Sequence, residues 1–260
     1  MRPTLILAAA LAAASAPLYA QSCREADAGL AAGYSEMQAN GNYGGQAWSE
    51  SRDRRLDAAE KRFSAKLAAY LARPASWGCA FPKLRAAGVE TAAAADGKIR
   101  AFSWDRQNGG TMHNEETLLQ YRSGGKTALR TGSGGAVRGI TAARLPPYGT
   151  VYFVHYRFRA SSRLYTDRTE LLHIAKGRLK PLNIIRTSRL GNSLAYEADI
   201  AVRTAPARRQ GKRPHCLRRG NAHRQPARGG GGKRKRRRRK DNGTARIRYR
   251  FDGRYFVLQR

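Results

Sequence analysis

Residues 96–113 read DGKIRAFSWDRQNGGTMH and constrain the fold more than any other part of the chain. Asp96-Gly97 is a dipeptide that favours a tight turn between antiparallel strands. The segment Ile99–Trp104 that follows is rich in apolar and aromatic side chains, as strands are. Asn108-Gly109-Gly110 then supplies residues that tolerate positive φ. We therefore expect a hairpin around Asp96-Gly97, followed by a second reversal into a strand over residues 111–122.

Similar strand and turn signals recur towards the C-terminus. Residues Thr150–Arg159 read TVYFVHYRFR, in which alternate side chains are apolar, so that one face of a strand is expected to be buried. Lys176-Gly177 and Asp252-Gly253 lie between apolar segments and predict two more hairpins. The three glycine turns are about 80 and 76 residues apart, which fits a degenerate propeller repeat or ordinary hairpins. The predicted fold class is mainly β, an antiparallel meander that forms a sandwich, a barrel or a small propeller-like array.

Two helices are expected before the strands, over residues 24–38 and 49–72. The second helix carries an apolar stripe at steps of three and four residues. The stripe consists of Leu56, Ala59, Phe63, Leu67, Tyr70 and Leu71. Arg73-Pro74 should end this helix, because a proline disfavours helical geometry in the residue before it. We expect an N-terminal helical hairpin whose stripe packs on its own domain, with a partner-binding groove as the alternative.

The first 20 residues have the pattern of a secretory signal peptide. Arg2 forms a short charged head, Leu5–Ala14 is apolar, and the small residue Ala20 marks the expected cleavage site. A membrane anchor is the alternative, but the apolar run is too short to span about 30 Å of hydrocarbon. We therefore expect a periplasmic or secreted protein with no membrane span in the mature chain.

Export affects how the cysteines are interpreted, because an oxidising compartment favours their pairing. Cys23 and Cys79 both lie in the well-patterned part of the chain, and we predict a disulfide between them, with two separate buried thiols as the alternative. Such a bridge closes a loop of about 55 residues and stabilises the fold by roughly 3–4 kcal/mol. Cys216 has no evident partner.

These patterns divide the chain into a signal peptide over 1–20, a helical annex over 21–87 and an antiparallel β domain over 88–260. A basic segment over 205–241 interrupts the β domain. The formal net charge is +32, and residues 203–240 hold 17 Lys and Arg and no Asp or Glu, which leaves +15 for the rest of the chain. Leu217 is the only large aliphatic residue over 205–240, and charges this dense repel one another and bury no core.

Three interpretations of the basic segment compete. It is a disordered polycationic loop that binds nucleic acid, lipopolysaccharide or another polyanion, or a solvated insertion without a partner. The third interpretation is a shifted reading frame between two compensating insertions or deletions. GC-rich codons yield Arg, Gly, Pro and Ala in most frames, and glutamate codons read one base off can encode Arg and Lys.

The sequence contains no recognisable catalytic, cofactor-binding or metal-binding motif. None of the five histidines lies in an HExxH arrangement. Asp105 and His113 flank the glycine reversal and form a candidate loop site, for which a polar loop is the plainer interpretation. A hydrolase that uses His113 with a nearby carboxylate is the sharper hypothesis. It would be abandoned if His113 were buried against aliphatic side chains with no adjoining cleft.

Four motifs, DGKIRAFSWD, GGTMH, QYRSGGK and YRFDGRYFV, carry a resemblance. The chain resembles a family of exported bacterial proteins with no established activity, over roughly Val89–Asp199 and Thr244–Gln259. The resemblance implies export and a strand-rich architecture, and it supplies no catalytic residues. The leading hypothesis is therefore an exported, non-enzymatic protein. Polyanion binding through the basic segment and a hydrolase centred on His113 are the alternatives.

Overall fold

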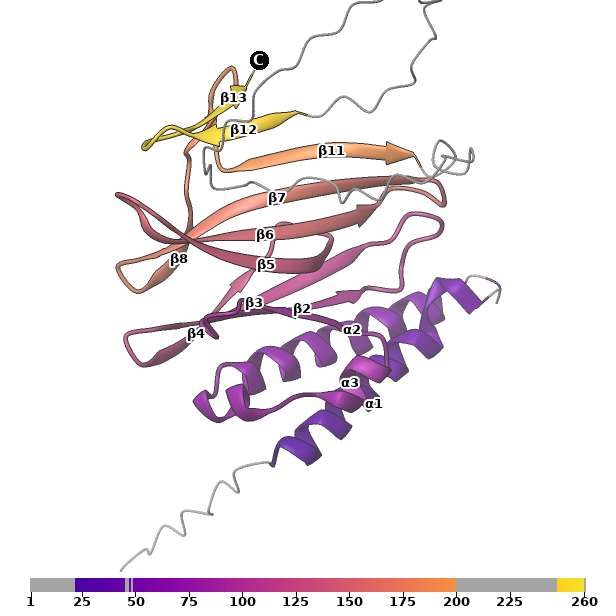
Figure 1. Cartoon of the computed structure of the whole chain (residues 1–260). Helices are drawn as coiled ribbons and strands as arrows, with labels where there is room; N and C mark the ends of the chain where they lie inside the picture. The colour runs from indigo at the N-terminus through magenta and orange to yellow at the C-terminus, as the bar shows by residue number, and fades with distance from the viewer. Residues whose placement is uncertain (1–21, 45–46, 48, 200–246, 260) are drawn as a thin grey trace, which may run out of the picture.

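The computed structural model describes residues 22–44, 47, 49–199 and 247–259. The predicted signal peptide and the basic segment 205–241 lie outside these ranges. Within them the protein is mainly β, with helices packed on one side of a stack of three sheets (Figure 1). The predicted fold class, with its N-terminal helical hairpin, is therefore confirmed. Among the described residues, no helix is both long and apolar enough to cross a membrane.

The helical hairpin consists of α1 (Cys23–Asn40) and α2 (Glu50–Leu71), joined through the short 3-10 helix η1 (Asn42–Gly44). Ser22 and Glu25 form a capping box at the start of α1, which satisfies backbone N–H groups that have no partner within the helix. At the start of α2 the Ser49 side chain accepts a hydrogen bond from the backbone N–H of Arg52. All six residues of the predicted stripe on α2 are buried, so the stripe packs within the protein.

A second 3-10 helix, η2 (Pro74–Gly78), and the short α3 (Pro82–Ala86) lead from the hairpin to the sheets. The predicted disulfide is confirmed: Cys23 at the start of α1 is bonded to Cys79 after η2, with 5.3 Å between the Cα atoms. Asp27 of α1 is buried and accepts hydrogen bonds of 2.9 Å from the backbone N–H groups of Lys83 and Leu84. These two links fix α3 against α1.

Sheet A packs against the helices and has the strand order β1-β2-β3-β4. Its strands are β1 (Glu90–Ala93), β2 (Ile99–Asp105), β3 (Glu115–Ser123) and β4 (Lys126–Thr131). The predicted hairpin around Asp96-Gly97 is confirmed, and Gly97 adopts a φ of +65° there. The strand predicted from residue 111 begins only at Glu115. The preceding backbone makes loop contacts instead: His113 N donates to the Arg159 carbonyl at 3.0 Å.

Sheet B lies on the other face of sheet A and has the strand order β11-β7-β6-β5, with β8 paired to β7. Its strands are β5 (Ala136–Leu145), β6 (Gly149–Arg159), β7 (Leu164–Ala175), β8 (Arg178–Pro181) and β11 (Ser193–Asp199). Tyr152, Val154 and Tyr156 of β6 pack towards sheet A, as the alternation predicts. Val151 and Phe153 are buried on the opposite face, because a third sheet covers it.

Sheet C is that third sheet, with the strand order β10-β9-β13-β12. Its strands are β9 (Ile185–Arg186), β10 (Leu190–Gly191), β12 (Arg248–Phe251) and β13 (Phe256–Gln259). The predicted C-terminal hairpin is confirmed, and β13 also pairs in parallel with β9. The three glycine turns belong to hairpins in three different sheets, so the stack is sandwich-like and the turns are ordinary hairpin turns.

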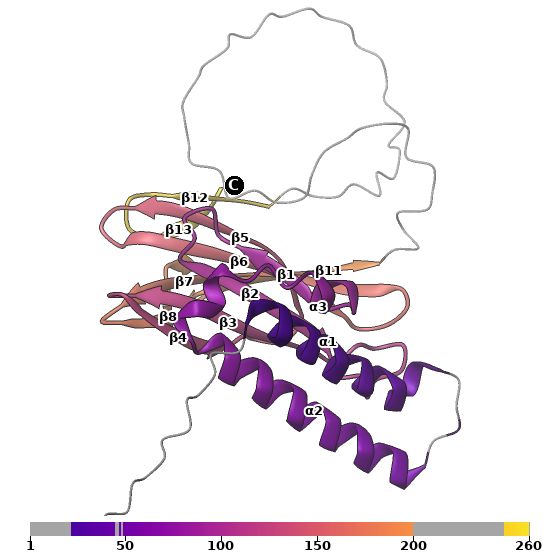
Figure 2. The ribbon, with the colours of Figure 1, turned by 90° about the horizontal axis from the view of Figure 1, so that it is seen from below.

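The core has one cluster between each pair of layers. Figure 2 shows α1 and α2 side by side across sheet A, where their apolar faces meet Phe102 and Trp104. The cluster between sheets A and B includes Ile99, Leu119, Tyr121, Tyr152, Val154 and Leu172. The cluster between sheets B and C includes Val151, Phe153, Leu171, Ile184, Ile185 and Phe256. Sheets A and B are thus covered on both faces, and the loops at their ends are left to carry polar groups.

Candidate functional site

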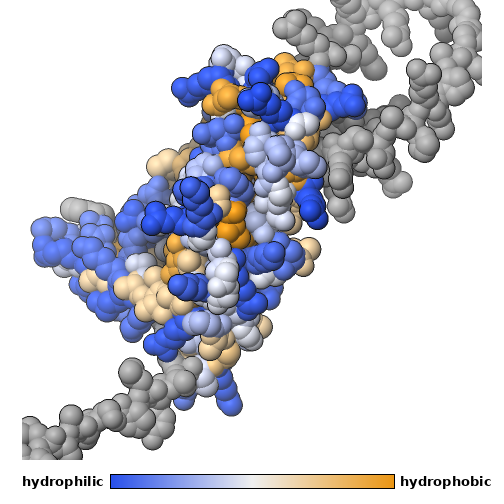
Figure 3. Space-filling model, turned by 90° about the vertical axis from the view of Figure 1, so that its left-hand side faces the viewer, coloured by the Kyte–Doolittle hydropathy of each residue, from blue (hydrophilic) through white to orange (hydrophobic). Residues whose placement is uncertain are grey.

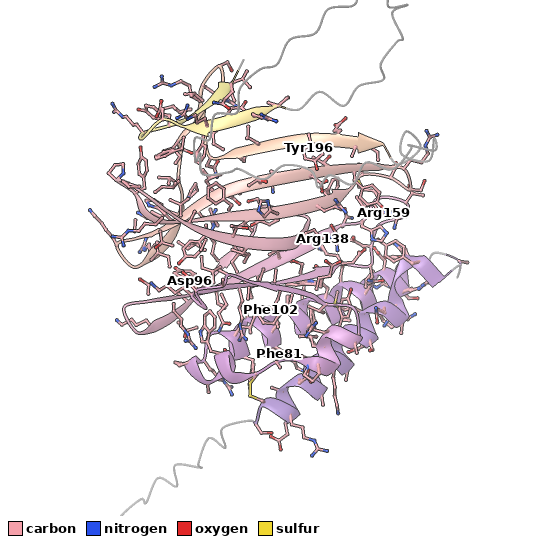
Figure 4. The ribbon with its side chains drawn as sticks, in the orientation of Figure 1. Phe81, Asp96, Phe102, Arg138, Arg159 and Tyr196 are labelled. Carbon is pink, nitrogen blue, oxygen red and sulfur yellow. A yellow bond between two sulfur atoms is a disulfide. The ribbon has the colours of Figure 1, made fainter. Side chains whose placement is uncertain are left out.

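The candidate site lies where the end of β2, the loop to β3, η1 and the last residue of β6 come together. Figure 4 shows Arg159 of β6 at the right-hand end of the sheets, above the end of the helical hairpin, and Arg138 of β5 nearer the middle of the molecule. The predicted loop residues Asp105 and His113 lie here. Their side chains are in direct contact, with 2.6 Å between the Asp105 Oδ2 and His113 Nδ1 atoms.

Asp105 is the centre of the hydrogen-bond network, and its side chain is 11% exposed. The Tyr43 hydroxyl donates to both carboxylate oxygens, at 3.2 and 3.1 Å. The backbone N–H of Gln107 donates to Oδ1 at 2.8 Å. Burial, together with the Asp105 carboxylate, raises the pKa of Tyr43, so its hydroxyl remains a donor at neutral pH. Asp105 therefore fixes η1, the loop and His113 around one carboxylate.

His113 is held on three sides. Its ring stacks on Tyr43, with 5.0 Å between the ring centroids. Its Nε2 atom lies 3.0 Å from Nη1 of Arg159. Because a guanidinium only donates hydrogen bonds, Nε2 is the acceptor here and Nδ1 carries the proton that is donated to Asp105. The geometry thus assigns a single tautomer, in which both ring nitrogens already have protein partners.

A cavity of about 200 Å³ adjoins these groups. Its lining includes Tyr34, Glu90, Ser103, Trp104, Gln107 and Glu115, together with Tyr43, Asp105 and His113. Three of these side chains are carboxylic acids from three different strands or strand ends. Two aromatic residues of the helical part, Tyr34 and Tyr43, also line it, so the cavity is formed jointly by the helical hairpin and sheet A.

Glu115 is the carboxyl group that the cavity affects most. Burial raises the pKa of Glu115 to about 7, and the charges of Glu90 and Asp105 add to this effect. The Ala136 N–H, which donates to Oε2 at 3.0 Å, and the charge of Arg138 act in the opposite direction. That bond is the only side-chain hydrogen bond of Glu115 among the described residues, so Oε1 is open to a ligand. Near pH 7, Glu115 is present in both its neutral and its charged form.

The sequence predicted part of this site. Asp105 and His113 are brought together as expected, and Glu115 follows His113 closely in the chain. No local sequence pattern assigns Tyr43 or Arg159 to the site, because they reach it only through the packing of α1 and β6 on sheet A. His113 is 27% exposed, stacked on an aromatic ring and beside a cavity, so the condition for abandoning the hydrolase hypothesis is not met.

The part of the chain described here contains no group of three or more His, Cys, Asp or Glu side chains that could hold a metal ion. His155 lies in β6 and contacts the Thr169 hydroxyl at 2.9 Å, and burial lowers its pKa. It is a packed strand residue.

No family model, curated protein or solved structure matches the chain. The resemblance to exported bacterial proteins therefore rests on the four sequence motifs alone.

Proposed function

We propose that the protein is an exported, non-enzymatic binding protein whose ligand occupies the cavity beside Asp105 and His113. The observation that carries the proposal is which polar atoms beside the cavity already have hydrogen-bond partners and which atom does not. Asp105 accepts three donors and both ring nitrogens of His113 have partners, whereas Oε1 of Glu115 remains open. Such an arrangement is suited to holding a ligand in a fixed geometry.

Export is supported by two independent features. The first 20 residues have the signal-peptide pattern. The Cys23–Cys79 disulfide joins two elements of the fold, and disulfides of this kind persist in oxidising compartments. We therefore place the protein in the periplasm or outside the cell.

The lining of the cavity favours a small cationic ligand. Oε1 of Glu115 is available to accept a charge-assisted hydrogen bond from an ammonium or guanidinium group, which is a strong one, while the carboxylates of Asp105 and Glu90, already bonded to His113 and Arg138, add negative charge beside it. The volume of about 200 Å³ suits a small organic molecule and excludes a folded partner. An aromatic side, formed by Tyr34 and Tyr43, adds favourable contacts for a cation.

The proposal is tested by calorimetric titration of the oxidised protein with agmatine, putrescine and ethanolamine. We expect binding of at least one of them, and we expect Glu115→Gln to weaken it by at least tenfold, because a hydrogen bond to a charged group contributes about 1.5–3 kcal/mol. Glu116→Gln is the matched control, since Glu116 points to the other face of β3, where it contacts Arg106. Absence of binding, or an equal loss in both variants, would contradict the proposal.

The pH dependence of binding follows from Glu115. Its pKa is about 7, so the carboxylate becomes populated as pH rises through this value. The ligand amines and guanidinium keep their charge over the same range. Affinity should therefore increase between about pH 6 and 8 in the wild type and remain flat in Glu115→Gln.

A hydrolase centred on His113 is the second candidate. The contact of 2.6 Å between Asp105 and Nδ1 of His113 favours it, since a carboxylate orients a catalytic histidine in this way. The position of Arg159 opposes it, because the Nε2 lone pair that would accept a proton already accepts from the guanidinium. Turnover of chromogenic esters that is lost in His113→Gln would favour the hydrolase. Equal background rates would favour the binding protein.

A further inference from the structure

Sheet C presents a row of residues across all four of its strands. The register places Leu190, Arg186, Val257 and Arg250 opposite one another in adjacent strands. Side chains that are paired in this way lie on the same face of a sheet. Ile185 and Phe256, of the opposite parity, are buried against sheet B, so the row points away from the protein.

This outer surface is strongly basic. Arg248 lies on the same face as Arg250, and Arg254 occupies the turn between β12 and β13. We call Arg186, Arg248, Arg250 and Arg254 the arginine face; all four are exposed. Over the described ranges, no carboxylate pairs with any of them within 4.0 Å.

Asp252 is the one acidic residue in the β12–β13 hairpin. Its Oδ1 atom accepts the backbone N–H groups of Arg254 at 2.9 Å and Tyr255 at 2.7 Å. These backbone hydrogen bonds lower the pKa of Asp252. The Asp252 carboxylate therefore holds the turn, although the charge of Arg186 also acts on it, and the ion pairs of the described residues include none of the four arginines.

One exposed apolar side chain, Leu190, lies on the same face as these cations. Five large hydrophobic residues are exposed in the described parts of the chain, and three of them belong to this region. Leu190 is 46% exposed and lies on the row itself, whereas Ile247 and Leu258, at 59% and 49%, lie at the open end of the β12–β13 hairpin and have the parity of Tyr249 and Phe256, on the face opposite the arginines. Figure 3 shows hydrophobic and hydrophilic residues interleaved at the top of the molecule, where sheet C lies.

We propose that the arginine face docks on an anionic lipid surface, with the guanidinium groups on lipid phosphates and Leu190 in the adjoining apolar layer. Basic and aliphatic side chains together are what such a surface recognises. Single-stranded nucleic acid would instead require exposed aromatic rings for stacking. Tyr255 does not offer one, because Arg186 and Arg254 lie over its ring, at 4.2 and 5.1 Å from the centroid.

The surface is separate from the cavity beside Asp105, and it consists only of described residues. It does not depend on the basic segment 205–241, whose polyanion binding remains a distinct proposal from the sequence. Elution of the full chain from a heparin column that stays unchanged after deletion of 205–241 would refute that proposal. The experiment below keeps the segment in every variant, so that its contribution cancels.

The test is co-sedimentation of the full-length protein with vesicles of phosphatidylcholine containing one-third phosphatidylglycerol. The triple variant Arg186→Gln, Arg248→Gln, Arg250→Gln should bind at least tenfold more weakly, since each basic residue at an anionic surface contributes about fivefold. The matched control, Lys61→Gln, Lys66→Gln, Arg85→Gln, removes the same charge from the helical side. Equal losses in the two triple variants would overturn the proposal.

A second variant separates a lipid surface from soluble phosphate. Leu190→Gln should weaken binding to the anionic vesicles and leave binding to soluble polyphosphate unchanged, because only the vesicle offers an apolar layer. An equal effect on both probes, or none on the vesicles, would overturn the lipid assignment. Preference of the wild type for an oligonucleotide over the vesicles would do so as well. Thermal unfolding of each variant confirms that these exposed substitutions leave the fold intact.

Discussion

Replacing Cys23 and Cys79 with serine is expected to lower the free energy of unfolding by about 3–4 kcal/mol. The disulfide links residues 56 apart in the sequence, so the unfolded chain gains substantial conformational freedom when it is removed. The folded state also loses the bond that holds the start of α1 against the segment between η2 and α3. Because α1 forms one side of the cavity, ligand binding should weaken in the same variant.

Urea denaturation of the double serine variant, followed by circular dichroism, measures this effect. Cys216→Ser is the matched control, since it removes a thiol and leaves the bridge in place. The oxidised wild type should contain one free thiol per chain, and a reductant should bring its stability down to that of the double variant. Three free thiols in the protein purified from the periplasm, or equal midpoints for all variants, would contradict the predicted role of the bridge.

The second large effect is expected at Glu170 of β7, which is buried between sheets A and B. Its Oε1 atom accepts from Nη2 of Arg130 at 3.2 Å and from Asn192 at 3.1 Å, and its Oε2 atom accepts from the Ser133 hydroxyl. Glu170→Ala leaves the Arg130 charge and two other donors without their acceptor. Breaking a buried pair by removing one partner costs about 3–5 kcal/mol.

A double-mutant cycle isolates this interaction. Arg130→Leu alone should also destabilise the protein, whereas Arg130→Leu combined with Glu170→Leu should recover much of the loss, because both charges are then absent. Chemical denaturation of the four proteins provides the coupling free energy. Additive losses, with no recovery in the double variant, would contradict the assignment of Glu170 as the acceptor that ties β4 to β7.

The fold was predictable where the signal was local. The stripe on α2, the turn at Asp96-Gly97 and the alternation in β6 each depend on residues close in sequence, and each prediction is confirmed. The division into three sheets was not predictable. It depends on pairings such as β13 with β9, which join residues about 70 apart and have no counterpart in local periodicity.

The candidate site was predictable in the same limited way. Asp105 and His113 flank one glycine reversal, so their proximity could be inferred from the loop alone. Tyr43 comes from the end of the helical hairpin and Arg159 from the end of β6, and both arrive through tertiary packing. The buried Glu170 likewise follows a regular strand pattern in the sequence, and nothing local distinguishes it from an exposed glutamate.

The arginines of β12 illustrate a related ambiguity. The alternation of Arg248 and Arg250 with Tyr249 and Phe251 predicts one basic and one apolar face, and this is what sheet C has. The pattern alone cannot say whether the basic face is simply solvated. The row completed by Arg186 and Leu190 required the pairing of β9 with β13 and β10.

The central claim is that Glu115 is a partly buried carboxyl group in the lining of a cavity suited to a cationic ligand. Carbon-13 NMR titration of the glutamate side-chain carboxyl groups, with Glu115→Gln to assign the resonance, tests it most directly. The account predicts a midpoint near pH 7 for Glu115 in the free protein, and a lower midpoint when an amine ligand is bound. A midpoint close to the ordinary value of 4.5 would show that Glu115 is fully hydrated and would contradict the account.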